Sequence, residues 1–159
     1  MRLSRFTDIG LRALMYIAAQ QRNVSAREVA EAFHVSRDHV TKSMQGLVTL
    51  GALRSTPGRN GGFEMDRHPS ELRLGDVVRR MEPSIQMAEC FSADSACPLT
   101  PDCTLATALL QAREAFFASL NRYTLEDLVR GTYAGLVQIA PRRGIAAGAE
   151  VSAGSPVHA

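Results

Sequence analysis

The sequence contains few cysteines, no long apolar run and no internal repeat. Cysteine occurs three times in 159 residues, and an odd number of cysteines cannot all pair within one chain. No apolar run approaches the roughly 20 residues that span a bilayer, so we expect no membrane partner. With 45% hydrophobic and 21% charged residues, the composition is that of one ordinary globular domain, or of a small domain with an extension.

The N-terminal stretch MRLSRFTDIGLRALMYIAAQ combines basic and apolar residues, as a signal peptide does. Asp8, Arg12 and Gln20 interrupt it at helical spacing, however, and this pattern favours an amphipathic helix. We therefore expect a cytoplasmic protein. In that compartment clustered cysteines are more often metal ligands or redox groups than structural disulfides.

The net charge of +2 conceals an asymmetry between the two halves of the chain. Residues 1–67 hold ten Lys and Arg against six Asp and Glu, whereas residues 68–159 hold eight against ten. A basic N-terminal half beside a mildly acidic C-terminal half is typical of a nucleic-acid-binding domain joined to another function. An excess of this size also arises by chance.

The first fifty residues predict three helices. In each case a Ser or Thr precedes an apolar pattern of helical period, and this residue is the expected N-cap. The expected caps are Thr7, Ser25 and Ser36, for helices over residues 8–20, 26–34 and 37–50.

A hairpin is predicted directly after the third helix. Gly51 is a signal for a helix C-terminus, and ALRSTPGRNGGFEM places two strand-like pieces around a turn. Three helices and a hairpin in this order indicate a winged helix-turn-helix. Ala30 is small where two helices of such a motif approach, and Val40 and Leu47 are apolar on the inner side of the last helix. His34 occupies the turn, where glycine is usual, and histidine tolerates a left-handed backbone better than most residues.

The remaining segments predict a short helix, a long helix and a short final helix. LRLGDVVRRMEP ends at Pro83, TLATALLQAREAFFASL forms the long helix, and Thr124 caps LEDLV. From Pro141 the chain is rich in Gly, Ala, Pro and Ser, and we expect a disordered tail over residues 141–159.

The long helix carries an apolar stripe at helical spacing. The stripe could pack within its own domain, but a small winged core has limited surface to receive it, which favours a dimerisation helix. Its members are Leu105, Leu109, Ala112, Phe116 and Leu120.

A winged helix-turn-helix would bind double-stranded DNA with its third helix in the major groove. The N-terminal residues of that helix would face base edges, where Arg can contact guanine through two hydrogen bonds, while Lys and Ser more often hold phosphate. Asp38 is an unfavourable charge beside phosphates. The candidates are Ser36, Arg37, His39 and Lys42 on the helix, Arg59 and Asn60 at the hairpin tip, and Arg2 and Arg5 at the N-terminus.

The three cysteines form one pattern, C-x6-C-x5-C, at Cys90, Cys97 and Cys103. Structural zinc sites usually pair closer ligands, and no histidine lies within this segment. Thiolates are the usual ligands of iron–sulfur clusters. A reversible thiol switch and three idle cysteines are the other interpretations, and the spacing leaves them open.

Taken together, these segments resemble the Rrf-type family of winged-helix iron–sulfur regulators, and within it the nitric-oxide-sensing repressors. The resemblance covers most of residues 1–130 but not the tail. Its departures are His34 and Asp38, where relatives often carry Gly and Asn. The matching pieces are MRLSRFTDIGLRALMYIA, SAREVAEAFHVSRDHVTK, GRNGGF, the cysteine pattern and NRYTLEDLV.

The resemblance implies a cofactor and a fourth ligand. In the nitric-oxide sensors three cysteines hold a four-iron, four-sulfur (4Fe-4S) cluster, and an Asp in the first helix of the other subunit can complete it. By position this is Asp8, although a carboxylate in a first helical turn is also favoured without any metal. Relatives with a 2Fe-2S cluster carry a His three residues after the last Cys, where this chain has Ala106.

The resemblance thus implies a mainly α protein that is no enzyme. It would be a homodimeric repressor that releases operator DNA on reaction with nitric oxide. Residues 1–67 would form the winged helix-turn-helix domain, and residues 68–130 the cysteine loop and dimerisation helix. An iron- or cluster-status regulator of the same fold, with a 2Fe-2S cluster as the alternative cofactor, and a zinc or thiol redox protein remain the alternatives.

Overall fold

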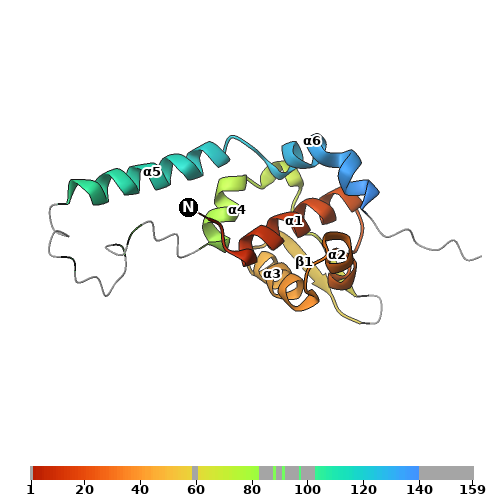
Figure 1. Cartoon of the computed structure of the whole chain (residues 1–159). Coiled ribbons are helices and arrows are strands. Elements are labelled where there is room, and N and C mark those ends of the chain that lie inside the picture. The colour runs from red at the N-terminus through yellow and green to blue at the C-terminus, as the bar shows by residue number, and fades with distance from the viewer. Residues whose placement is uncertain are drawn as a thin grey trace, which may run out of the picture.

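A computed structural model describes residues 2–58, 61–82, 88, 91, 97 and 103–139. The fold is mainly helical with one small antiparallel sheet, as predicted (Figure 1). The tail predicted to be disordered, residues 141–159, lies outside the described residues. The helices are α1 (Arg5–Gln20), α2 (Ala26–Phe33), α3 (Arg37–Thr49), α4 (Leu74–Met81), α5 (Thr104–Leu120) and α6 (Leu125–Gln138); the strands are β1 (Leu53–Thr56) and β2 (Gly62–Met65), followed by the 3-10 helix η1 (Pro69–Glu71).

The first helix begins earlier than the sequence indicated. Ser4 is its N-cap, and the Ser4 hydroxyl accepts a hydrogen bond from the backbone N–H of Thr7 at 3.2 Å. The prediction that Thr7 caps this helix was therefore wrong by three residues. Ser and Thr are both good caps, and tertiary contacts decide between them, because the Thr7 side chain is buried and turned toward the end of α4.

Helices α2 and α3 form the helix-turn-helix. The Ser25 hydroxyl accepts from the N–H of Glu28 at 3.1 Å, which confirms Ser25 as the cap of α2. His34 follows α2 with φ 53° and ψ 46°, the left-handed conformation expected at the turn. Ser36 occupies the N-cap position of α3 as predicted, but its side chain makes no capping hydrogen bond.

A polar cluster holds α2 against α1. The Tyr16 hydroxyl donates to Glu28 at 2.9 Å, and the Arg22 guanidinium donates to the same carboxylate. Burial of the phenol and its hydrogen bond to Glu28 raise the pKa of Tyr16 well above its ordinary value. The helix-turn-helix is thereby tied to the first helix by a satisfied polar contact as well as by apolar packing.

The wing is the antiparallel pair β1–β2, in which Leu53 faces Met65 and Thr56 faces Gly62. Phe63 also exchanges two backbone hydrogen bonds of 2.8 Å with Val24, so the wing is joined to the segment between α1 and α2. Gly62 is required at this crossing. A Cβ there would lie 2.7 Å from the carbonyl oxygen of Val24.

The hydrophobic core surrounds α1, and Figure 1 shows α1 between α6 and the helix-turn-helix. The core joins side chains of the winged segment to others that follow residue 67. The division of the chain at residue 67 into two domains stays a prediction. The later contributors are Leu72, Val77, Met81 and Leu125.

Helix α6 is longer than predicted. The expected short helix LEDLV continues to Gln138; α6 packs on α1, and Leu136 in its later turns is buried. Thr124 does cap it: its hydroxyl accepts from the N–H of Asp127, and the Asp127 carboxylate accepts from the N–H of Thr124.

Helix α5 extends away from the winged part of the molecule (Figure 1). Its C-terminal half is held to α4 by Phe117, which is buried, and by an ion pair between Arg79 and Glu114. Its N-terminal half leaves Leu105 65% exposed and Leu110 38% exposed. Of the predicted apolar stripe, Leu109, Phe116 and Leu120 are half-buried, whereas Leu105 and Ala112 are exposed, so the stripe is only partly covered within one chain.

Replacing Gly62 by alanine tests the crossing of the wing and the α1–α2 segment. We expect Gly62→Ala to lower the free energy of unfolding by about 1–3 kcal/mol, because the added methyl group meets a backbone oxygen that cannot turn away. Gly131→Ala is the matched control: apart from the backbone of its own helix turn, no described atom lies within 4 Å of a Cβ at that position in α6, and alanine there should stabilise the helix slightly. Chemical unfolding of both variants measures the difference, and equal stabilities would contradict the close approach.

Candidate DNA-binding surface and cysteine site

The exposed face of α3 carries four of the predicted DNA contacts. Val40, Met44 and Leu47 turn the opposite face of the helix into the core. Because the apolar residues of α3 recur at helical spacing on one side, the polar residues of the helix face solvent on the other side. The exposed candidates, all within or beside the first two turns, are Ser36, Arg37, His39 and Lys42.

Arg37 lines a groove between α3, the start of α2 and the wing, with a volume of about 390 Å³. Thr41 and Gln45 line the same groove from α3, and Ser55 and Thr56 line it from β1. These four polar residues were missed in the sequence analysis. The spacing of Arg37, Thr41 and Gln45 by four residues was the signal that could have found the two on α3.

The remaining DNA candidates are placed differently. Arg2 and Arg5 are exposed at the start of α1. The next residue, Phe6, contacts Gly46 of α3, about 14 Å along the helix from Arg37 at 1.5 Å per residue. The N-terminal arginines therefore lie toward the other end of α3. Arg59 and Asn60 lie outside the described residues.

The structure gives Asp38 a local role. It lies in the first turn of α3, where the Ser36 side chain provides no cap. A carboxylate at this position is favoured by the helix dipole and the unpaired N–H groups of the first turn. Asp38 thus stabilises the start of α3, although its charge opposes phosphate.

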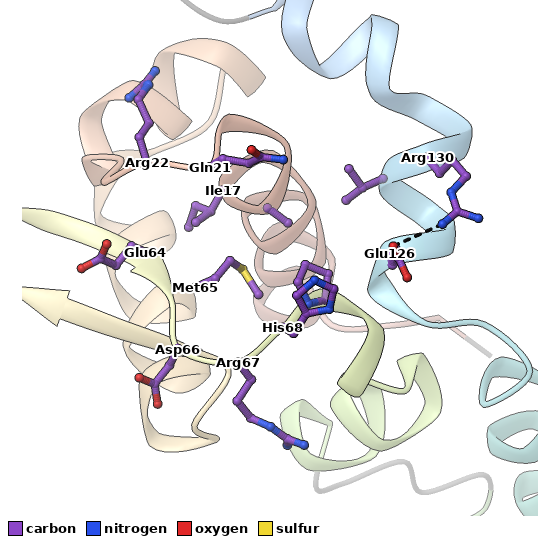
Figure 2. Close-up of a pocket in the computed structure, with 13 residues that line it drawn as sticks. Ile17, Gln21, Arg22, Glu64, Met65, Asp66, Arg67, His68, Glu126 and Arg130 are labelled. Carbon is purple, nitrogen blue, oxygen red and sulfur yellow. Dashed lines mark ion pairs between the residues drawn. The ribbon is translucent and has the colours of Figure 1, made fainter.

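A second hollow, of about 730 Å³, lies between α1, β2 and α6. Figure 2 shows Ile17 and Met65 on one side of it and the Glu126–Arg130 ion pair of α6 on the other, with His68 between them in this view. Of the predicted DNA and metal contacts that the structure describes, none lines it.

The cysteine site is described only in part. Cys97 and Cys103 are half-buried, and Cys90 lies outside the described residues. Cys103 is the N-cap of α5, and it makes no capping hydrogen bond through its side chain. In the described ranges no group of three His, Cys, Asp or Glu side chains is placed to hold a metal ion.

The donor set nevertheless fits an iron–sulfur cluster. Thiolates are its usual ligands, and Cys103 places one of the three cysteines at the N-terminus of a 17-residue helix. The positive end of the helix dipole and the open N–H groups there favour a negatively charged group. Ala106, in the first turn of α5, has no side-chain donor for a metal.

Asp8 lies in the first turn of α1 and forms an ion pair with Arg12. The distances are 3.0 Å from Nε to Oδ1 and 2.9 Å from Nη2 to Oδ2, and both side chains are about half exposed. An exposed pair of this spacing contributes only about 0.3–0.5 kcal/mol. The carboxylate is therefore accessible and weakly held, as a ligand supplied to another subunit would need to be.

Glu82, which is half-buried, makes contacts that no sequence pattern indicated. Its Oε2 accepts from the Ser4 N–H at 2.9 Å, the Ser4 hydroxyl at 2.7 Å and the Thr7 hydroxyl at 2.6 Å. Partial burial raises the pKa of Glu82, but the hydrogen bonds from Thr7 and Ser4 outweigh this effect and leave the pKa below its ordinary value.

A sequence model of the Rrf2 family, described as iron-dependent transcriptional regulators, matches residues 3–131. The chain belongs to the Rrf2 family. The match covers the winged helix-turn-helix and all three cysteines. It also makes the protein a transcriptional regulator.

Two curated relatives support the family assignment. The chain is 38% identical over 132 residues to the HTH-type transcriptional regulator NsrR of Geobacillus kaustophilus (strain HTA426), covering 81% of this chain and 90% of the relative. It is 36% identical over 132 residues to the regulator of the same name from Shouchella clausii (strain KSM-K16), covering 81% and 89%. The similarity thus spans nearly the full length of both relatives.

A solved structure shows the same fold. The global cysteine regulator CymR of B. subtilis superposes with a TM-score of 0.64 at 22% identity, over 83% of this chain and 98% of that one. The winged-helix fold predicted for this Rrf2 protein is thereby confirmed. None of the described helices combines the length and apolar character needed to cross a membrane.

Arg37→Ala tests the α3 surface. We expect it to weaken binding to duplexes that the wild-type protein selects from a random library by about 1–3 kcal/mol, because a two-bond contact to a base edge would be lost. Binding to an unselected duplex should change little. The control is Arg67→Ala, an exposed arginine after β2 that pairs with Glu71. Equal losses on both duplexes would instead assign Arg37 to phosphate.

Proposed function

We propose that this Rrf2 regulator is a homodimeric repressor that senses nitric oxide through an iron–sulfur cluster. The observation that carries the proposal is the position of Cys103 at the N-cap of α5. It joins the last cysteine of the triad directly to the helix with exposed leucines. The similarity to regulators named NsrR supports the same function. The relatives are regulators, and we assign no catalytic activity.

The exposed N-terminal half of α5 supports the homodimer. Leu105 and Leu110 present apolar surface to solvent there, and complete burial of one leucine contributes roughly 1.5–3 kcal/mol. A second copy of α5 would cover this surface. The two recognition helices of the dimer would then enter successive major grooves, about one helical turn of DNA apart.

The residues that would hold the cluster are Cys90, Cys97 and Cys103, with Asp8 of the partner subunit as the fourth ligand. A bound 4Fe-4S cluster supplies an iron that nitric oxide can attack. Asp8 would be the most easily displaced ligand, because its oxygen is a hard donor among soft thiolates. Its weak ion pair with Arg12 would re-form when the carboxylate is released.

The presence of Ala106 favours a four-iron cluster over the 2Fe-2S alternative. The two-iron relatives carry a histidine ligand at this position, and alanine offers no donor. A cluster-status regulator with the 2Fe-2S cluster, or a zinc or thiol protein, would therefore need a different ligand set. The cytoplasmic location stays a prediction.

Cys97→Ala tests whether the cysteine segment controls DNA binding. Protein purified without oxygen should be brown with broad absorbance near ~400 nm, and Cys97→Ala should lose this absorbance together with binding to the selected duplexes. Thr132→Ala, a change of similar size on an exposed face of α6, is the control. A colourless wild-type protein that contains zinc would refute the cluster.

Asp8→Ala tests the fourth ligand. We expect its cluster to assemble and to react with nitric oxide at a changed rate, because the displaceable oxygen is gone. The measurement is a nitric oxide titration that follows absorbance and duplex binding together. Asp66→Ala, which removes an exposed carboxylate after β2, should match the wild type. The ligand assignment fails if Asp8→Ala also titrates like the wild type.

A further inference from the structure

The end of α4, the start of α1 and the middle of α3 meet at one junction. Glu82 directly follows α4, and its carboxylate accepts three hydrogen bonds from Ser4 and Thr7, more than seventy residues earlier in the chain. The Thr7 hydroxyl also lies 3.2 Å from the carbonyl oxygen of Met81. Hydrogen bonds to an ionised acceptor are among the stronger ones in proteins. The first turn of α1 is therefore fastened to the end of α4.

A second contact connects the same turn to α3. The Ser43 hydroxyl donates to the carbonyl oxygen of Phe6 at 2.9 Å, and the Phe6 ring covers Gly46, where a Cβ would lie 2.5 Å from the ring. Thr7 and Ser43 are the two buried polar side chains in the described part of the chain. Both lie at this junction, and burial is costly for polar groups that have no hydrogen-bond partner.

The side chain of Met81, at the end of α4, packs directly against Gly10 of α1. A Cβ on Gly10 of α1 would lie 2.2 Å from the terminal methyl group of Met81. Close-packed interfaces of this kind shift between discrete arrangements rather than deform continuously. A displacement at the end of α4 would therefore carry the first turn of α1 with it.

The two sides of the junction serve different parts of the proposed function. The segment with the three cysteines begins after Glu82, and α3 carries the candidate DNA contacts. We infer that Glu82 is a positioning residue that couples the cysteine segment to the recognition helix of the same subunit, through Ser4, Thr7 and Ser43. This inference rests on the proposed function and adds an intrasubunit route to it.

The test compares duplex affinity with and without cluster. For the wild type, the ratio of the two affinities measures the coupling between the sites. Glu82→Gln keeps the size of the side chain but removes the charge that accepts three hydrogen bonds. We expect normal cluster absorbance per chain and an affinity ratio at least about fivefold closer to one. A merely structural role would lower stability and leave the ratio unchanged.

A second variant and a control complete the experiment. Ser43→Ala removes the last hydrogen bond of the route without touching Glu82, and it should reduce the ratio as Glu82→Gln does. If Glu82→Gln does not fold, the affinity ratio of Ser43→Ala alone decides whether the coupling exists. Glu71→Gln alters an exposed carboxylate that pairs with Arg67, and it should keep the wild-type ratio.

The outcomes separate the two proposals. If both Glu82→Gln and Ser43→Ala keep the wild-type affinity ratio, the coupling role of Glu82 is overturned, while the proposed nitric oxide sensing is unaffected. A wild-type protein that holds no cluster, or binds the duplex equally well with and without it, overturns both. A reduced ratio in the two variants with normal cluster absorbance supports the inference.

Discussion

The buried face of α1 is the constraint on which the other elements of the molecule depend. Nine of its sixteen residues are buried, and α3, α4, α6 and β2 all pack against it. Because one helix supports both the DNA-binding motif and the elements that flank the cysteine segment, neither can be repositioned without disturbing the same core. A regulator built on such a helix can transmit a local change by rigid-body movement.

Polar contacts then determine how this shared core is used. The Tyr16–Glu28 hydrogen bond orients α2, and Glu82 fastens the start of α1 to the end of α4. Both carboxylates accept hydrogen bonds from side chains of α1. Their hydrogen bonds are local, directional and sensitive to single substitutions, in contrast to the more tolerant apolar contacts.

The sequence predicted those features that depend on near neighbours. Ser25 and Gly51 mark helix ends because capping involves residues only a few positions apart, and His34 adopts the expected left-handed conformation. Thr7 was misassigned and α6 was predicted too short because both errors concern contacts with distant segments: Thr7 binds Glu82, and Leu136 is buried in α6, which packs on α1. Ser55 and Thr56 join the candidate surface only because the wing folds beside α3.

By itself the sequence determined the class of the protein: a winged helix-turn-helix, a triad of cysteines and a long helix with an apolar stripe. These follow from short-range periodicity and spacing, which the chain carries before it folds. Only the tertiary structure decided that Cys103 caps the start of α5, that Leu105 and Leu110 in its first half remain exposed, and that Glu82 meets Ser4 and Thr7. The last contact joins residues more than seventy positions apart, and no local pattern encodes such a meeting.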